Sequence, residues 1–94
     1  MKIDQKRIQV NFQGRVQGVG FRYTVVSLSH TFSVTGYVKN LGDGSVELVA
    51  EGNEDELLSF VREILSSGLQ RYIFNHTVFW ENARGAFNTF GVAY

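Results

Sequence analysis

The sequence predicts an α+β domain with the element order β-α-β-β-α-β and a short additional strand at the end. Most of the expected strands show apolar residues that alternate with polar ones, which is typical of half-buried strands. Two other segments carry apolar residues three and four positions apart, as on one face of a helix. No repeat or linker interrupts the chain, so we expect residues 1–94 to form a single domain.

The first half of the chain predicts a strand, a helix and a hairpin. Alternation of apolar and polar residues predicts a strand over residues 8–13. The inner face of the helix that follows would carry the apolar residues Phe21, Val25, Leu28 and Phe32. Residues 34–39 and 46–51 alternate again on either side of an Asp-Gly turn, which predicts a hairpin.

The second half predicts a helix and two strands. Asn53 is placed to cap the helix, with Glu56 three residues later completing a capping box, and Gly68 is expected near its end. Residues 70–81 are rich in aromatic and β-branched residues and predict a strand with one face packed in the core. A last short strand carries Phe90, Val92 and Tyr94. This order of elements is the ferredoxin-like pattern, with two helices on one face of a sheet containing antiparallel strands.

The glycine-rich segment of residues 14–22 predicts an anion site. Its three glycines allow backbone N–H groups to turn toward one point, and the start of the helix adds partial positive charge. Arg22 in the first helical turn opposes the helix dipole, which a bound oxyanion would explain. The segment lacks the Gly-Lys-Ser/Thr of a P-loop and the third glycine of a dinucleotide fingerprint. The pattern alone also allows a plain glycine-rich turn followed by a surface arginine.

The predicted topology brings this segment close to Asn40. The first two strands of the fold are parallel, with the third between them, so their carboxyl ends lie at the same edge of the sheet. The glycine segment leaves the first strand there, and Asn40 ends the second. Two strand spacings, roughly 10 Å, separate the two backbones. A small ligand between them would contact the loop, Arg22 and Asn40 together.

Composition and charge exclude several classes of partner. Nine Lys and Arg balance nine Asp and Glu, so we expect no nucleic acid or acidic membrane as a partner. Without cysteine, the chain has no thiolate, and His30 and His76 have no companions at metal-ligand spacing, so we expect no metal. No signal peptide or membrane-spanning run is visible, so cytoplasmic residence is expected.

Two motifs together resemble the acylphosphatases. The first is Gly14-Arg15-Val16-Gln17-Gly18-Val19-Gly20-Phe21-Arg22, and the second is Gly36-Tyr37-Val38-Lys39-Asn40. Residues 43–47 and the C-terminal run with Phe87, Phe90, Val92 and Tyr94 also look like that family. The resemblance covers essentially the whole chain in length and element order. It is close over residues 10–65 and loose over residues 66–86.

The resemblance implies hydrolysis of the carboxyl-phosphate bond of small acyl phosphates, without metal or cofactor, and we expect a monomer. It implies that Arg22 binds the phosphate and that Asn40 orients the attacking water. The phosphoryl oxygens would be held by the backbone amides of Arg15, Val16, Gln17, Gly18, Val19 and Gly20.

Two other functions are compatible with the predicted fold. One is a non-catalytic ferredoxin-like module that binds a phosphorylated or acidic ligand, and the presence of both Arg22 and Asn40 favours the enzyme over it. The other is an RNA-binding sheet, which would need a basic and aromatic central strand. Residues 45–51 carry acids instead, which disfavours RNA binding.

Overall fold

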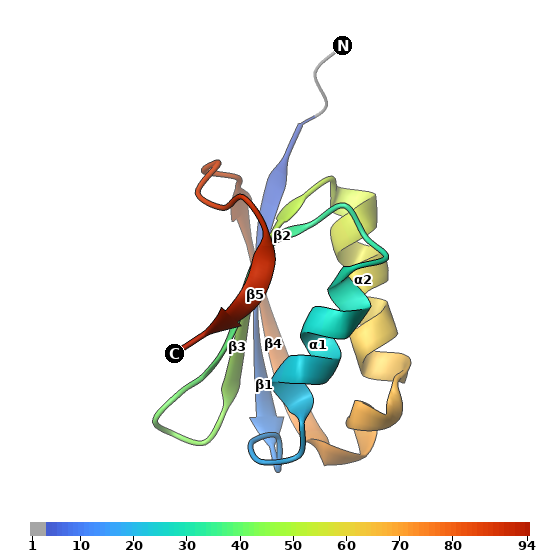
Figure 1. Cartoon of the computed structure of the whole chain (residues 1–94), viewed down its shortest axis with the longest axis vertical. Helices are drawn as coiled ribbons and strands as arrows, with labels where there is room; N and C mark the ends of the chain where they lie inside the picture. Colours follow the sequence, from blue (N-terminus) through green and yellow to red (C-terminus); the bar gives the residue numbers. More distant parts are fainter. Residues whose placement is uncertain (1–3) are drawn as a thin grey trace.

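Residues 4–94, which the computed structural model describes, form a five-stranded sheet with two α-helices on one face (Figure 1). Residues 1–3, the start of the predicted single domain, lie outside the described residues. The elements are, in order, β1 (Lys6–Gly14), α1 (Phe21–Ser29), β2 (Thr35–Asn40), β3 (Val46–Gly52), α2 (Glu54–Ser66), the 3-10 helix η1 (Gly68–Tyr72), β4 (Ile73–Asn82) and β5 (Phe90–Ala93).

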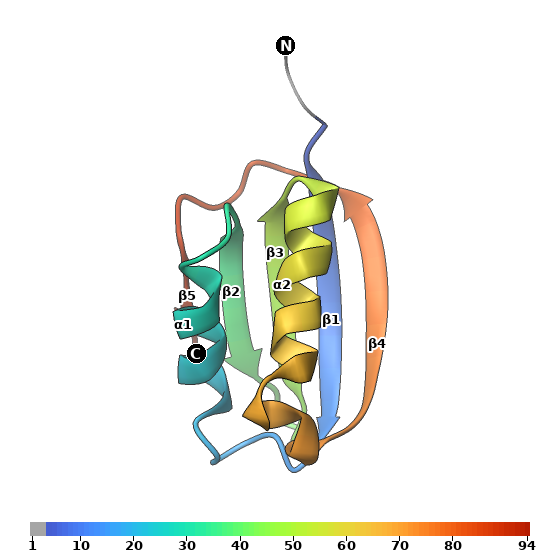
Figure 2. The same cartoon turned by 90° about the vertical axis from the view of Figure 1, so that its right-hand side faces the viewer.

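The strand order β4-β1-β3-β2-β5 confirms the predicted ferredoxin-like topology. Strand β3 is antiparallel to both β1 and β2, so β1 and β2 run in the same direction on either side of it. The short strand β5 pairs in parallel with β2. Figure 2 shows that β1 and β2 end at the same edge of the sheet, where the glycine segment connects β1 to α1.

The core lies between the sheet and the inner faces of the two helices. Aromatic rings join its layers: Phe12 of β1 lies 5.2 Å from Phe21 of α1, between ring centroids. Phe60 of α2 lies 5.4 Å from Phe90 of β5 and 5.6 Å from Phe32, which follows α1. Burying such rings supplies much of the stabilisation of a small domain. Of the helices formed by residues 4–94, none combines the length and the apolar character needed to cross a membrane.

Helix α2 begins and ends where the sequence predicts, but its capping interactions differ. Asn53 occupies the N-cap position, yet its Oδ1 accepts a hydrogen bond from Gln5 Nε2 at 2.6 Å instead of capping the helix. Glu56 Oε1 accepts from the Ser33 N–H at 2.7 Å. The predicted capping box is therefore wrong, because both side chains have partners distant in the sequence. The expected cap at Gly68 is also wrong, since Gly68 begins η1.

The predicted strand over residues 70–81 is correct only from Ile73 onward, because the residues before it belong to η1. Strand β4 lies at the edge of the sheet. Val78 and Trp80 share the helix-side face with the buried β1 residues they pair with, but they are 43% and 38% exposed. The expected core packing of this face is therefore wrong. Val78 and Trp80 instead line an apolar groove beside Leu58 and Val61 of α2.

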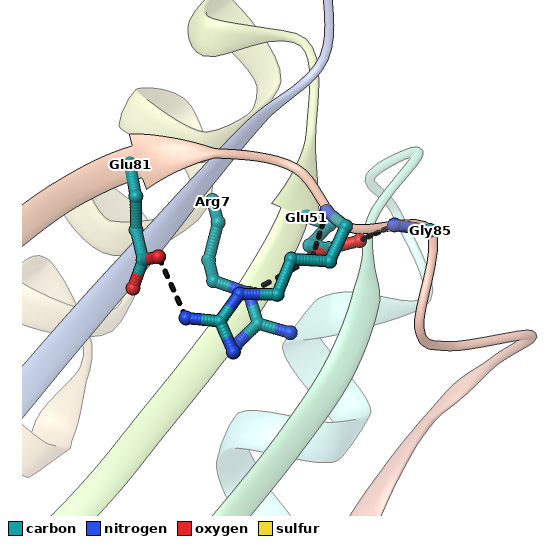
Figure 3. A network of polar contacts seen from close by, with 5 residues as sticks. Arg7, Glu51, Glu81 and Gly85 are labelled. Carbon is teal, nitrogen blue, oxygen red and sulfur yellow. Dashed lines mark hydrogen bonds and ion pairs between the residues drawn. The ribbon is translucent and has the colours of Figure 1, made fainter.

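The connection from β4 to β5 crosses the end of the sheet and is held by the buried carboxylate of Glu51 (Figure 3). Its Oε2 accepts hydrogen bonds from Arg7 Nε at 2.8 Å and from the Arg84 N–H at 2.9 Å. Its Oε1 accepts from the Gly85 N–H at 3.0 Å. The Arg7 guanidinium also lies 5.1 Å from the ring centroid of Phe87. One carboxylate thus fixes the path of the chain into β5.

These contacts make the pKa of Glu51 lower than its ordinary value of 4.5. Burial raises this pKa, but the hydrogen bonds from Arg84, Arg7 and Gly85 and the charge of Arg7 lower it further than burial raises it. Because the pKa is lower in the folded than in the unfolded chain, the carboxylate contributes stability at pH values above 4.5. That contribution is lost as the pH falls through the folded-state pKa.

We expect Glu51→Gln to lower the free energy of unfolding at neutral pH by about 2–4 kcal/mol, because Arg7 loses its buried charge partner. Urea denaturation followed by circular dichroism measures this change. Glu63→Gln, at an exposed position of α2, is the matched control and should change stability by less than about 0.5 kcal/mol. The deficit of Glu51→Gln should shrink as the pH falls below 4.5 through the folded-state pKa, because the wild-type carboxylate then also loses its charge. A deficit that stays constant across this range would contradict the assigned role.

Candidate active site

The loop between β1 and α1 depends on its glycines for two different reasons. Gly14, Gly18 and Gly20 have φ angles of 134°, 80° and 77°, in the region that favours glycine. At Gly14 a Cβ atom would also collide with the carbonyl oxygen of Tyr72. At Gly18 and Gly20 there is open space around the missing Cβ, so the backbone conformation alone requires glycine. Gly20 is the N-cap residue of α1.

Most of the loop amides have no hydrogen-bond acceptor among the described residues. The Arg15 N–H is the exception, because it donates to the Tyr72 carbonyl oxygen at 2.9 Å and ties the start of the loop to η1. Within residues 4–94, the N–H groups of residues 16–20 donate no hydrogen bond to a protein acceptor. Helix α1 has neither a side-chain cap nor an acidic residue in its first turn. The loop and helix start therefore offer unpaired donors and partial positive charge to an anion.

Gln17 fastens the loop to the turn between β2 and β3. Its Nε2 donates to the carbonyl oxygens of Leu41 at 2.8 Å and Ser45 at 2.9 Å. The turn is itself fixed, because Asp43 Oδ1 accepts from the Ser45 N–H at 2.9 Å and Asn11 Nδ2 donates to Ser45 Oγ at 2.9 Å. The sequence indicates only a backbone role for Gln17. The side-chain role is not visible in the sequence, because its partners are carbonyl groups distant in the chain.

A small cavity of about 180 Å³ brings the two predicted side chains together. Its lining residues are Val16, Gly18, Gly20, Phe21, Arg22, Tyr23 and Asn40. Of the loop residues expected to hold a ligand, Val16, Gly18 and Gly20 line the cavity, whereas Arg15, Gln17 and Val19 do not. Tyr23, which no sequence motif indicated, also lines this cavity and is 66% exposed.

Asn40 ends β2 with an unsatisfied acceptor at the cavity. Its Oδ1 is buried and has no hydrogen-bond partner among the described residues. Buried polar atoms almost always have a partner, and exceptions occur at functional sites. This unsatisfied oxygen marks Asn40 as a candidate functional residue of the cavity.

Arg22 brings positive charge to the same cavity from the first turn of α1. Its side chain is half-buried, and its Cζ lies 5.5 Å from the ring centroid of Tyr94. Among residues 4–94, no carboxylate forms an ion pair with it. The guanidinium charge therefore adds to that of the loop amides without being neutralised. The described residues also contain no group of three His, Cys, Asp or Glu that would hold a metal ion.

Comparison with known proteins gives a consistent result. The sequence model of the family "Acylphosphatase" matches residues 8–92. An acylphosphatase of Salinibacter ruber is 39% identical over 88 residues, which cover 94% of this chain and 93% of the relative. One from Methanospirillum hungatei is 49% identical over 59 residues, covering 63% of this chain but just 65% of the relative, slightly under two thirds of its length.

Comparison with solved structures indicates the same family. The crystal structure of the Bacillus subtilis acylphosphatase superposes with a TM-score of 0.84 at 33% sequence identity, covering 95% of this chain and 99% of that one. Because the family match takes in nearly all of the sequence and both motifs that line the cavity, this chain belongs to the acylphosphatase family.

Proposed function

We propose that this chain hydrolyses the carboxyl-phosphate bond of small acyl phosphates, giving a carboxylate and inorganic phosphate. The observation that carries this proposal is the cavity where an unneutralised arginine, unpaired loop amides and an unpaired asparagine oxygen meet. Phosphoryl transfer requires mainly positioning and charge stabilisation, and these groups are suited to both tasks.

The loop and Arg22 hold the phosphoryl group. Of the unpaired amides of residues 16–20, those of the cavity-lining residues Val16, Gly18 and Gly20 donate to its oxygens, aided by the positive end of α1. The Arg15 amide is left out of this set because Tyr72 occupies it. Arg22 adds two parallel hydrogen bonds and a full positive charge. The stabilisation that this charge provides increases as negative charge develops on the transferring phosphoryl group.

Asn40 orients the attacking water through its Oδ1, which accepts a hydrogen bond from it. The water oxygen forms a bond to phosphorus while the bond from phosphorus to the carboxyl oxygen breaks, and the electron pair leaves with the carboxylate. An asparagine amide is no base at neutral pH. The water's proton therefore passes to an oxygen of the substrate phosphate.

The leaving group explains how so simple a site suffices. A carboxylic acid has a pKa of roughly 4, so the carboxylate departs without a general acid. The residues described around the cavity include no carboxyl or imidazole group. A phosphate monoester, whose alkoxide needs a proton, would be a poor substrate for this site. The same chemistry requires no metal or cofactor.

We further propose that residues 1–94 act as a single domain, as a monomer in the cytoplasm, with a small acyl phosphate as the partner. All groups of the site come from β1, α1, β2 and the segments joining them, so one chain supplies a complete site. The exposed Phe74 and Phe79 lie on β4, which is the edge strand at the opposite end of the strand order from β5 and is remote from Asn40 of β2. Sedimentation equilibrium tests the monomer, and a self-associating species would contradict it.

The wild-type chain should release phosphate from benzoyl phosphate in the presence of EDTA, far faster than the uncatalysed reaction. A phosphate assay measures the rate, with p-nitrophenyl phosphate as the matched monoester that should remain intact. The rate should show no titration of an enzyme group between about pH 6 and about pH 8, because the substrate accepts the proton. Phosphate binding without hydrolysis would instead support the non-catalytic module.

Arg22→Gln should lower kcat/KM for benzoyl phosphate by at least about 10²-fold, because the cavity loses its charged phosphate ligand. Arg22→Lys should recover only part of this loss, since an ammonium group lacks the paired geometry of guanidinium. Arg62→Gln, at an exposed position of α2, serves as the control and should keep full activity. Near-wild-type activity of Arg22→Gln would remove this residue from the mechanism.

Asn40→Ala should lower kcat by about 10²-fold while the inhibition constant of inorganic phosphate changes less than about twofold, because the water loses its acceptor and the phosphate ligands remain. Steady-state kinetics with phosphate as competitive inhibitor separates the two effects. Asn88→Ala, at an exposed position, is the control. If Asn40→Ala weakened phosphate binding but left kcat normal, Asn40 would bind the phosphate and would not orient the water.

A further inference from the structure

We propose that Tyr94 is a positioning residue for Arg22: its ring holds the guanidinium at the mouth of the phosphate loop without neutralising the charge. This inference rests on the proposed phosphate-binding role of Arg22. It goes beyond that role by assigning a function to the residue that follows β5.

The pairing of β5 places Tyr94 at the active-site edge. Strand β5 is parallel to β2, and its last residue Ala93 is opposite Lys39, so Tyr94 follows at the level of Asn40. Successive side chains of a strand alternate between faces, so Tyr94 shares the face of Phe90, which packs against Phe60 of α2. Tyr94 therefore lies on the helix side of the sheet, where its ring centroid is 5.5 Å from Arg22 Cζ.

Arg22 needs such a contact because its surroundings do not otherwise fix it. Its position in the first turn of α1 is unfavourable for a cation, since the helix dipole presents positive charge there. Its long side chain loses conformational entropy when held in one geometry. No carboxylate among residues 4–94 pairs with it. An aromatic face within about 6 Å attracts a guanidinium and restricts its orientation.

Arg7 is a contrasting case, in which a guanidinium contacts both an aromatic ring and a carboxylate. Arg7 stacks on Phe87 at 5.1 Å and also forms a buried ion pair with Glu51 at 2.8 Å (Figure 3). Its charge is thus already satisfied, as suits a structural residue. A carboxylate beside Arg22 would compete with a phosphate ligand for the same donors. The neutral ring of Tyr94 orients the guanidinium and leaves its hydrogen bonds free for the anion.

The exposure of Tyr94 makes the proposal testable. The residue is 87% exposed, so replacing it removes little buried surface and should leave the fold intact. Tyr94→Leu removes the aromatic face, whereas Tyr94→Phe keeps it and removes only the hydroxyl group. Phe79→Leu is the matched control, because Phe79 is 66% exposed on β4, away from the cavity lining.

The measurements are the dissociation constant of inorganic phosphate, kcat/KM for benzoyl phosphate, and the NMR signal of the Arg22 Nε–Hε group. For Tyr94→Leu we expect phosphate affinity and kcat/KM each to fall about two- to fivefold, the range of an exposed cation–π contact. The Hε signal should lose the upfield shift that the ring face produces. Tyr94→Phe and Phe79→Leu should match the wild type in all three. In an Arg22→Gln background, Tyr94→Leu should cause no further loss of phosphate affinity.

Two outcomes would overturn the assignment of Tyr94 alone: wild-type phosphate affinity in Tyr94→Leu, or an equal loss in Tyr94→Phe, which would assign the effect to the hydroxyl group. A wild-type chain that neither binds phosphate nor hydrolyses benzoyl phosphate would overturn the proposed function, and this inference with it. The wild-type measurement therefore distinguishes the two failures.

Discussion

The parallel direction of β1, β2 and β5 is the constraint on which the site depends. These strands are separated in the sequence, but all three end at one edge of the sheet. That edge therefore receives the glycine loop from β1, Asn40 from β2 and Tyr94 from beyond β5. The last of these depends on the far end of the sheet, where the Glu51 carboxylate fixes the chain that leads into β5.

The polar groups at the two ends of the sheet differ in whether they have partners within the protein. At the Glu51 end, the carboxylate accepts three hydrogen bonds and pairs with Arg7, so the cluster is internally neutral. At the loop end, the amides of residues 16–20 and the Arg22 guanidinium have no acidic partner among the described residues. A buried, satisfied cluster stabilises a particular chain path, whereas unpaired donors favour an anion that arrives from solution.

The sequence predicted well what depends on local periodicity and on topology. The strand and helix patterns determined the fold, and the fold in turn placed Asn40 beside Arg22. The wrong capping box and the features of the loop that the sequence did not indicate have one physical cause: hydrogen-bond partners far apart in the chain. Gln5 engages Asn53 and Ser33 engages Glu56, which removes the capping box; Tyr72 occupies the Arg15 amide; and carbonyl groups of the β2–β3 turn hold Gln17. Periodicity carries no information on such pairs.

The rigidity of the loop follows from these same non-local bonds. Glycine residues permit the conformation that turns N–H groups toward one point, but they also make the unfolded loop more flexible. The bond from Arg15 to Tyr72 and the two bonds from the Gln17 side chain restrict the first part of the loop. Donors that are already oriented need no reorganisation when charge develops on the phosphoryl group. The amide of Arg15 and the side chain of Gln17 thus hold the loop in place, whereas the amides of residues 16–20 remain without a protein partner among the described residues.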